Sequence, residues 1–222
     1  MAVIGVLEAA DRLGLSAARV RQLAAAGVIP ASKVGSVWAF DPGDLDPLPA
    51  RRRVAGRPMS AAIAWAVLRA REGRDIVGLE PYAASRARRY AQRDIEDLWP
   101  RLARRARLHE KFAHPSSLER LRSDDRLVLG GVSAADRNGA GLVIPGEVEA
   151  YVRVSDLEDV LVEHGLIDAT GEPNVFLRIV DDPSWPFDEG ARLAPRSVVA
   201  VDLFERSRGP DRLRAAAQAL SR

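Results

Sequence analysis

Two short helical patterns, separated by one glycine, constrain the fold of the first part of the chain more than any other feature. Apolar residues recur at helical spacing in both patterns: Leu7, Ala10 and Leu13 in the first, Val20 and Leu23 in the second. Gly14 ends the first pattern and Gly27 ends the second. Ser16 is a good N-cap for the second helix, because its hydroxyl can accept from an amide that has no partner within the helix. The pattern predicts a helix-turn-helix.

A β-hairpin is predicted directly after these two helices. Residues that favour strands flank a short turn: Val34 before it, and Trp38 and Phe40 after it. Gly35 and Ser36 fit a two-residue turn with glycine in the first central position. Asp41 can then cap a further helix, and Pro42 fits the first turn of that helix. Helix-turn-helix, hairpin and helix in this order predict a winged helix.

The outward side of the second predicted helix is a candidate DNA-reading surface. With Val20 and Leu23 inward, the residues that face outward are Ser16, Ala18, Arg19 and Gln22, with Arg21 on the flank. In the major groove, arginine pairs with guanine and glutamine with adenine. Lys33 lies beside the hairpin turn, where it can contact a phosphate. The alternative is an ordinary solvated helix face.

This segment resembles the winged-helix proteins of the excisionase and MerR type. The resemblance rests on EAADRLGLSAARVRQLAAAGVIPASKVGSVWAFDPGDL and covers residues 5–48. It implies that Ser16, Arg19, Arg21 and Gln22 enter the major groove, and that Lys33 and Ser36 lie on the wing. Many relatives carry a basic residue after the wing tryptophan, where this chain has Ala39, so we expect a weak wing contact. Trp38 is expected to anchor the wing to the core.

Charge is distributed unevenly along the 222 residues. Residues 1–112 contain 20 Lys and Arg against 12 Asp and Glu, whereas residues 113–222 contain 13 against 19. A basic segment indicates a polyanionic partner, although a general preference for arginine is the simpler reading.

Cysteine is absent, which excludes disulfides and thiolate metal ligands. Without a signal-peptide pattern or an apolar run of membrane-spanning length, we expect a cytoplasmic protein that does not enter a membrane.

The middle of the chain, residues 49–112, reads as a basic linker followed by helices. Residues 47–58 are rich in Pro, Gly and Arg, and Arg51, Arg52 and Arg53 are candidates to follow the DNA backbone. Ser60 can cap a helix that ends at Gly73. Residues 81–112 predict two more helices, with the break at Pro100. Two groups of arginines share helix faces and are either solvated or in contact with phosphates: Arg86, Arg89 and Arg93, and Arg101, Arg104 and Arg105.

The acidic segment, residues 113–222, has a mixed α/β pattern. Strands are predicted at 147–154 and 174–182, and helices at 155–165 and 211–222. Residues 194–205 fit either a helix or a strand, and we favour the helix. Ser155 and Glu158 are the expected capping box of the first of these helices. The chain is thus expected to be α+β, with a winged helix-turn-helix at 1–48, a helical segment at 49–112, and a mixed α/β domain at 113–222 for dimerisation or partner binding.

Residues 55–206 resemble the AbiEi-type antitoxins of type IV toxin–antitoxin systems. The resemblance rests on short blocks, which are GRPMSAAIAWAVL, AHPSSLERL, VEAYVRVSDLEDVL, NVFLRIV, WPF and APRSVVAVDLFE. It implies an antitoxin that is encoded beside a nucleotidyltransferase-like toxin and represses its own promoter.

Few residues point to catalysis. His109, His114 and His164 are too scattered for a metal site, and no phosphate-binding or nucleophile motif predicts a cofactor. Asp44 and Asp46 follow a Gly-Ser pair, as the metal-binding carboxylates of nucleotidyltransferases do. Pro42 disfavours the strand that such a site needs, so Asp44 more simply belongs to a helix start.

The sequence therefore predicts a DNA-binding transcriptional repressor, in particular an autoregulating antitoxin, and not an enzyme. We expect a homodimer that binds inverted repeats in double-stranded DNA, since two-fold operators mirror two-fold proteins. The other expected partner is a toxin encoded nearby, and no cofactor or metal is expected. An excisionase-like architectural DNA-binding factor is one alternative. A metal-dependent nucleotidyltransferase-like enzyme that uses Asp44 and Asp46 is another.

Overall fold

The chain forms two compact units, residues 1–55 and 56–222. The computed structural model describes residues 3–13, 15–25, 29–35, 37–45, 57–207 and 211–221. Both units combine helices with a sheet, so the protein is α+β as predicted. No helix in these ranges is long and apolar enough to cross a membrane.

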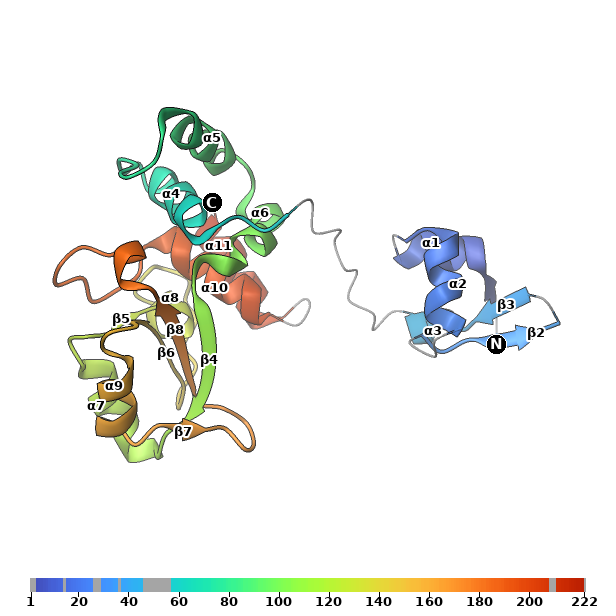
Figure 1. Cartoon of the computed structure of the whole chain (residues 1–222). Helices are drawn as coiled ribbons and strands as arrows, with labels where there is room; N and C mark the ends of the chain where they lie inside the picture. The colour runs from blue at the N-terminus through green and yellow to red at the C-terminus, as the bar shows by residue number, and fades with distance from the viewer. Residues whose placement is uncertain are drawn as a thin grey trace. The chain divides into compact units, whose positions relative to one another are not determined.

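Unit 1 packs its helices beside a small antiparallel sheet (Figure 1). Its elements are β1 (Ile4–Gly5), α1 (Val6–Leu13), α2 (Ala17–Ala25), β2 (Ser32–Val34), β3 (Val37–Phe40) and α3 (Pro42–Leu45). The hairpin of β2 and β3 was predicted, and Val34 opposes Val37 across its turn. Gly35 has φ of 64°, a left-handed conformation that glycine adopts without strain. The sequence pattern missed β1, which pairs with β3 and completes the sheet order β1-β3-β2.

The core of unit 1 contains apolar residues from β1, α1, α2, β3 and α3. Its buried members are Ile4, Ala9, Ala10, Leu13, Val20, Ala24, Ile29, Phe40 and Leu45. One part of the predicted helical stripe was wrong, since Leu7 is 74% exposed. The inward face of α1 is centred on Leu13, and Leu7 lies about 120° from it at 100° per residue.

Unit 2 is built around a five-stranded sheet of order β5-β6-β8-β4-β7. The strands are β4 (Arg107–Phe112), β5 (Val128–Leu129), β6 (Val148–Arg153), β7 (Ile167–Asp168) and β8 (Val175–Val180). The central pair β6 and β8 is parallel, and the other pairs are antiparallel. The predicted strands at 147–154 and 174–182 are confirmed as β6 and β8.

Helices cover both faces of this sheet, as the buried central strands require. The helices are α4 (Ala61–Arg71), α5 (Pro81–Ala91), α6 (Ile95–Leu102), α7 (Leu118–Ser123), α8 (Gly131–Ala135), α9 (Leu157–Glu163), α10 (Arg196–Arg206) and α11 (Arg212–Ser221), with 3-10 turns η1 (Ala103–Arg105), η2 (Pro115–Ser117) and η3 (Asp182–Ser184). Val148, Val152 and Leu177 share one core with α7 and α9. Tyr151 and Val180 share the other with α4, α6, α8, α10 and α11.

Two expectations for residues 81–112 were wrong. The helix break lies at 92–94, where the Asp94 carboxylate caps α6 by accepting from the Glu96 amide at 2.8 Å. Pro100 lies inside α6, where it removes one helical hydrogen bond near the end of the helix. Residues 107–112 form strand β4 and not a helix, because 107–111 pair with β8 and 111–112 pair with β7.

The pairing of β4 with β8 also bears on the domain organisation. Residues 57–112 and 113–221, which were expected to form separate segments, meet in this sheet and belong to one unit. The predicted helix at 194–205 is confirmed as α10, and the terminal helix as α11. The predicted capping box of α9 was wrong: the Ser155 hydroxyl instead donates to Asp182 at 2.6 Å, and α9 has no side-chain cap bond.

Candidate nucleic-acid interface

Helix α2 presents a continuous polar face to solvent. The predicted reading residues Ser16, Ala18, Arg19, Arg21 and Gln22 are all exposed, while Val20 and Ala24 are buried beneath them. The helix begins as predicted, because the Ser16 hydroxyl accepts from the Arg19 amide at 3.3 Å. This cap fixes the first turn of α2, which carries the exposed Arg19.

Arg19 and Gln22 contact each other on this face. The Arg19 guanidinium donates to Gln22 Oε1 at 3.3 Å, one helical turn apart. The remaining Arg19 N–H groups and the Gln22 amide nitrogen stay available as donors, since both side chains are exposed. The bond brings the two side chains together on the solvent-facing side of α2.

The β2–β3 hairpin supplies a further cation. Lys33 is exposed and opposes Trp38 across the hairpin, with its ammonium 5.7 Å from the centre of the indole ring. Trp38 is partly buried and packs on the core of unit 1, as its predicted anchoring role requires. The tryptophan thus connects the lysine to the core through a cation–π contact.

Several predicted site residues lie outside the described residues. These are Ser36, Arg51, Arg52 and Arg53, together with Asp46 of the alternative metal site. Asp44 lies in helix α3, which is not the strand that a nucleotidyltransferase site requires. Within the described ranges, no group of three or more His, Asp and Glu side chains could hold a metal ion.

A second cluster of charged residues, which the sequence reasoning missed, is buried inside unit 2. Sequence analysis placed Arg105 on a surface with Arg101 and Arg104, but its side chain is fully buried. Its guanidinium contacts Asp202 at 2.5 Å and Glu205 at 3.0 Å. Arg105 therefore balances carboxylates of α10 and cannot contact a phosphate.

Arg178 lies at the centre of the same cluster. Its guanidinium donates to the carboxylate of Glu149, on the neighbouring strand β6, at a distance of 2.8 Å. It also forms an ion pair with Glu205. Burial alone would raise the pKa of Glu205, but the charges of Arg105 and Arg178 outweigh that effect and lower it. A sequence signal existed: VFLRIV, VEAYV and VVAVDLFE each place a charge inside an apolar run, and the charges have opposite signs.

The glycine pair at the start of α8 also belongs to this cluster. The Gly131 amide donates to Asp202 at 2.9 Å, and the Val132 amide donates to Glu149 at 3.2 Å. A Cβ at Gly131 would lie only 1.9 Å from a Glu149 carboxylate oxygen. The two glycines of LVLGG, residues 127–131, therefore make room for two buried carboxylates.

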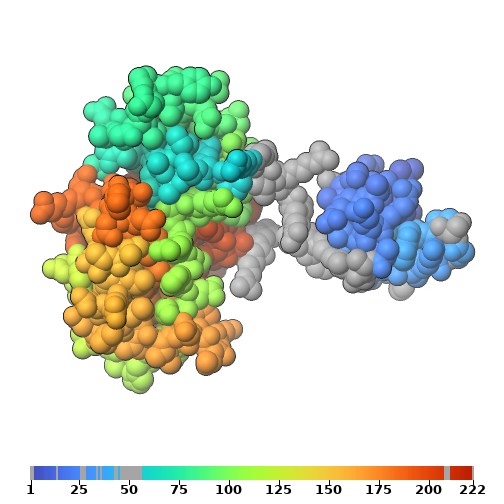
Figure 2. Space-filling model, viewed as in Figure 1, coloured from blue at the N-terminus to red at the C-terminus, as the bar shows by residue number. Residues whose placement is uncertain are grey.

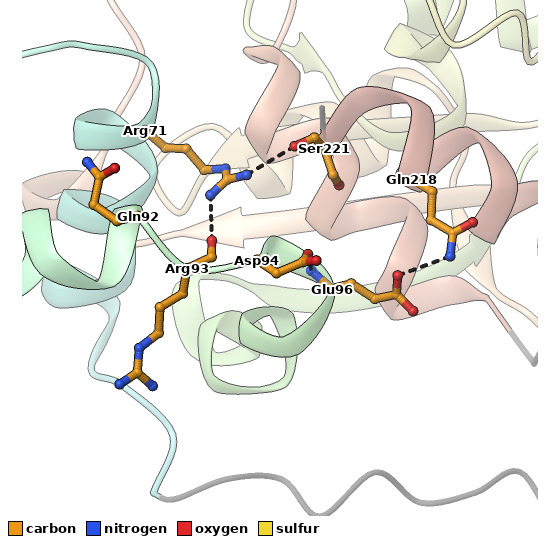
Figure 3. Close-up of a pocket in the computed structure, with 7 residues that line it drawn as sticks. All are labelled: Arg71, Gln92, Arg93, Asp94, Glu96, Gln218 and Ser221. Carbon is orange, nitrogen blue, oxygen red and sulfur yellow. Dashed lines mark hydrogen bonds between the residues drawn. The ribbon is translucent and has the colours of Figure 1, made fainter.

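A polar pocket of about 440 Å³ lies where α4, α6 and α11 meet (Figure 3). Its lining residues are Arg71, Gln92, Arg93, Asp94, Glu96, Gln218 and Ser221. The Arg71 guanidinium donates to the carbonyls of Ala91 at 2.9 Å, Arg93 at 2.7 Å and Ser221 at 3.2 Å. Gln218 donates to Glu96 at 3.0 Å. These bonds join three segments of the chain, so Arg71 has a structural role here.

We compared the chain with protein-family models, with curated proteins and with solved structures, and none of them matches it.

Proposed function

We propose that this protein is a sequence-specific DNA-binding transcriptional repressor whose unit 1 acts as a winged helix-turn-helix. The observation that carries the proposal is the exposed face of α2, on which Arg19 and Gln22 lie side by side above a buried apolar stripe. These two side chains can form bidentate contacts with guanine and adenine in the major groove. In this proposal α2 is the recognition helix, and Ser16, Ala18 and Arg21 complete its groove-facing surface.

The β2–β3 hairpin serves as the wing. Lys33 is exposed beside the turn, and an ammonium at that position suits a phosphate of the adjacent backbone. Phosphate contacts position a protein on the duplex, whereas base contacts specify the sequence. The two kinds of contact thus come from two elements of one small unit.

In this proposal unit 1 binds DNA, and unit 2 mediates self-association or binds a protein partner. A homodimer would present two copies of α2 to an inverted repeat. With the resemblance to AbiEi-type antitoxins, this arrangement supports an autoregulating antitoxin in the cytoplasm, with a toxin as partner. The size and separate core of unit 2 weigh against an excisionase-like architectural factor, which needs no such second domain.

The proposal is tested by binding of the full-length protein to the DNA directly upstream of its own gene. A scrambled duplex of equal length serves as the control, and both are titrated at two salt concentrations. A preference for the upstream DNA that persists at high salt supports the repressor. Equal binding to both, with a steep loss at high salt, would favour the architectural alternative. Absence of binding to either would reject both.

The same titration with Arg19→Ala separates readout from general attraction. Arg137→Ala is the matched control, because Arg137 is an exposed arginine of unit 2. The Arg19 variant should lose preference for the upstream DNA, while the Arg137 variant should retain it.

A further inference from the structure

Helix α5 has a face that carries cations without carboxylates. Tyr82, Arg86 and Arg89 follow one another at intervals of four and three residues, so they lie on one side of α5, and Arg93 follows shortly after the helix ends at Ala91. Residues 81–93 contain no aspartate or glutamate. We call these four residues the arginine face.

The arginine face is directed away from the core of unit 2. Ala84, Ala87 and Ala91 are buried on the opposite side of α5, which packs against α4. Tyr82 is 79% exposed, and Arg86, Arg89 and Arg93 are all exposed. In Figure 2 this segment forms the outer rim of unit 2 at the top of the view. Figure 3 shows the Arg93 guanidinium pointing out of the polar pocket that its backbone helps to line.

The positive charge of this face is not neutralised locally. Among the described residues, neither Arg86 nor Arg89 forms an ion pair. Arg93 and Arg101 lie over the ring of Tyr90, at 5.0 and 4.8 Å from its centre. A hydrogen bond from Arg101, together with the charges of Arg101, Arg93 and Arg86, lowers the pKa of the Tyr90 hydroxyl. Arg93 therefore contacts the ring of Tyr90, and Arg86 and Arg89 are exposed to solvent.

The spacing of these cations suits a polyanion of high charge density. Arg86 and Arg89 are separated by about 4.5 Å along the helix axis, at 1.5 Å per residue. A duplex of that length carries about three phosphates, at one charge per 1.7 Å. A small anion would need convergent side chains in a pocket, whereas Arg86 and Arg89 lie on a convex helix surface, with Arg93 just beyond the end of the helix.

We propose that the arginine face of α5 binds the phosphate backbone of the duplex DNA that unit 1 reads. The identity of the polyanion rests on the proposed function. Eleven residues, 46–56, separate Leu45, the last described residue of unit 1, from Arg57, the first described residue of unit 2, and a chain of that length spans at most about 40 Å. The face contributes affinity without sequence preference, because arginine contacts to phosphates do not distinguish bases.

The test compares two variants of the full-length protein that each lose two positive charges. Arg86→Gln with Arg89→Gln removes the centre of the arginine face. Arg137→Gln with Arg212→Gln removes two exposed arginines from other helices and loops of unit 2. Binding to the upstream duplex, to its scrambled version and to duplex RNA of the same sequence is measured over a salt series. Equal melting temperatures establish that both variants are folded.

The α5 variant should bind both DNA duplexes more weakly by a similar factor. The slope of log affinity against log salt should become shallower by about 1.8, since each lost phosphate contact removes about 0.9. A slope equal to that of the control variant would overturn the proposal, and so would a loss confined to RNA. If wild type shows no preference for the upstream duplex while the slope still falls, the repressor function fails and the arginine face stands as a DNA contact.

Discussion

Arg178 and Glu149 form a buried ion pair between the two parallel central strands of unit 2, with Arg178 Nη2 2.8 Å from Glu149 Oε1. Neither side chain is more than 1% exposed. Two opposite charges in such a place stabilise the fold only as a pair, because either one alone would be an uncompensated buried charge.

Removal of Arg178 should therefore be strongly destabilising. We expect Arg178→Met to lower the free energy of unfolding by about 3–5 kcal/mol, since Glu149 and Glu205 lose a shared partner. Urea unfolding followed by tryptophan fluorescence, to which the buried Trp65 of unit 2 contributes, measures the change. Arg137→Met, at an exposed position, should stay within about 0.5 kcal/mol of wild type. Similar losses for both variants would contradict a buried network.

Gly131 should tolerate alanine much less than Gly139 does. Both have positive φ, 40° and 86°, so both substitutions carry backbone strain of about 1–2 kcal/mol. Only at Gly131 would the new methyl group collide with Glu149, whereas Gly139 has open space. Thermal unfolding should show Gly131→Ala as the less stable variant by at least about 2 kcal/mol. Equal melting temperatures would show that the carboxylates do not need this space.

Asp124 should contribute stability that depends on pH. Burial alone would raise its pKa, but hydrogen bonds from Arg126 and His164 outweigh burial and hold the pKa well below the ordinary value. A depressed pKa stabilises the fold at pH values above the unfolded pKa of about 4, and this contribution is lost as the pH falls from there toward the folded pKa. Asp124→Asn should thus be destabilising at pH 7 and much less so near pH 2.

Chemical unfolding at both pH values tests this expectation for Asp124. Asp125→Asn is the matched control, because it changes an exposed neighbour. A loss of stability for Asp124→Asn that is the same at both pH values would rule out the linkage.

Readout by α2 predicts a change of specificity. Arg19→Ala or Gln22→Ala should relax discrimination at one base pair of the operator, at a cost of about 1–3 kcal/mol for a lost bidentate contact. Competition binding with operators mutated at single positions measures it. If both variants discriminate every position like wild type, α2 is not the recognition helix.

Lys33 should behave differently from Arg19. Lys33→Ala should weaken binding to all DNA about equally and make the salt slope shallower by about 0.9, as expected for one phosphate contact. Anisotropy titrations with operator and scrambled duplexes measure both quantities. A loss restricted to the operator would contradict the wing assignment.

Local signals in the sequence predicted the parts of the structure that depend on neighbouring residues. The Ser16 cap and the Gly35 turn are set by contacts within a few positions, so α2 and the hairpin were predicted correctly. The exposed face of α2 was also predicted correctly, because the apolar Val20 marks the buried side of the helix.

Other features depended on contacts between distant residues. Arg105 and its partner Asp202 are 97 positions apart, and nothing near Arg105 distinguishes it from the exposed Arg104. Strand β4 directly follows helical residues, and only its pairing with β8 determines that it is extended. The two-residue strand β1 is too short to show any periodicity.

One of the two cores of unit 2 connects Met59 to Leu220, whereas the core of unit 1 is contained between Ile4 and Leu45. During synthesis from the N-terminus, unit 1 has all its core residues outside the ribosome while most of unit 2 is still untranslated. Helices α4 to α6 must then wait for α10 and α11, which complete their hydrophobic surroundings. A nascent chain would therefore carry a folded unit 1 well before unit 2 can close its sheet.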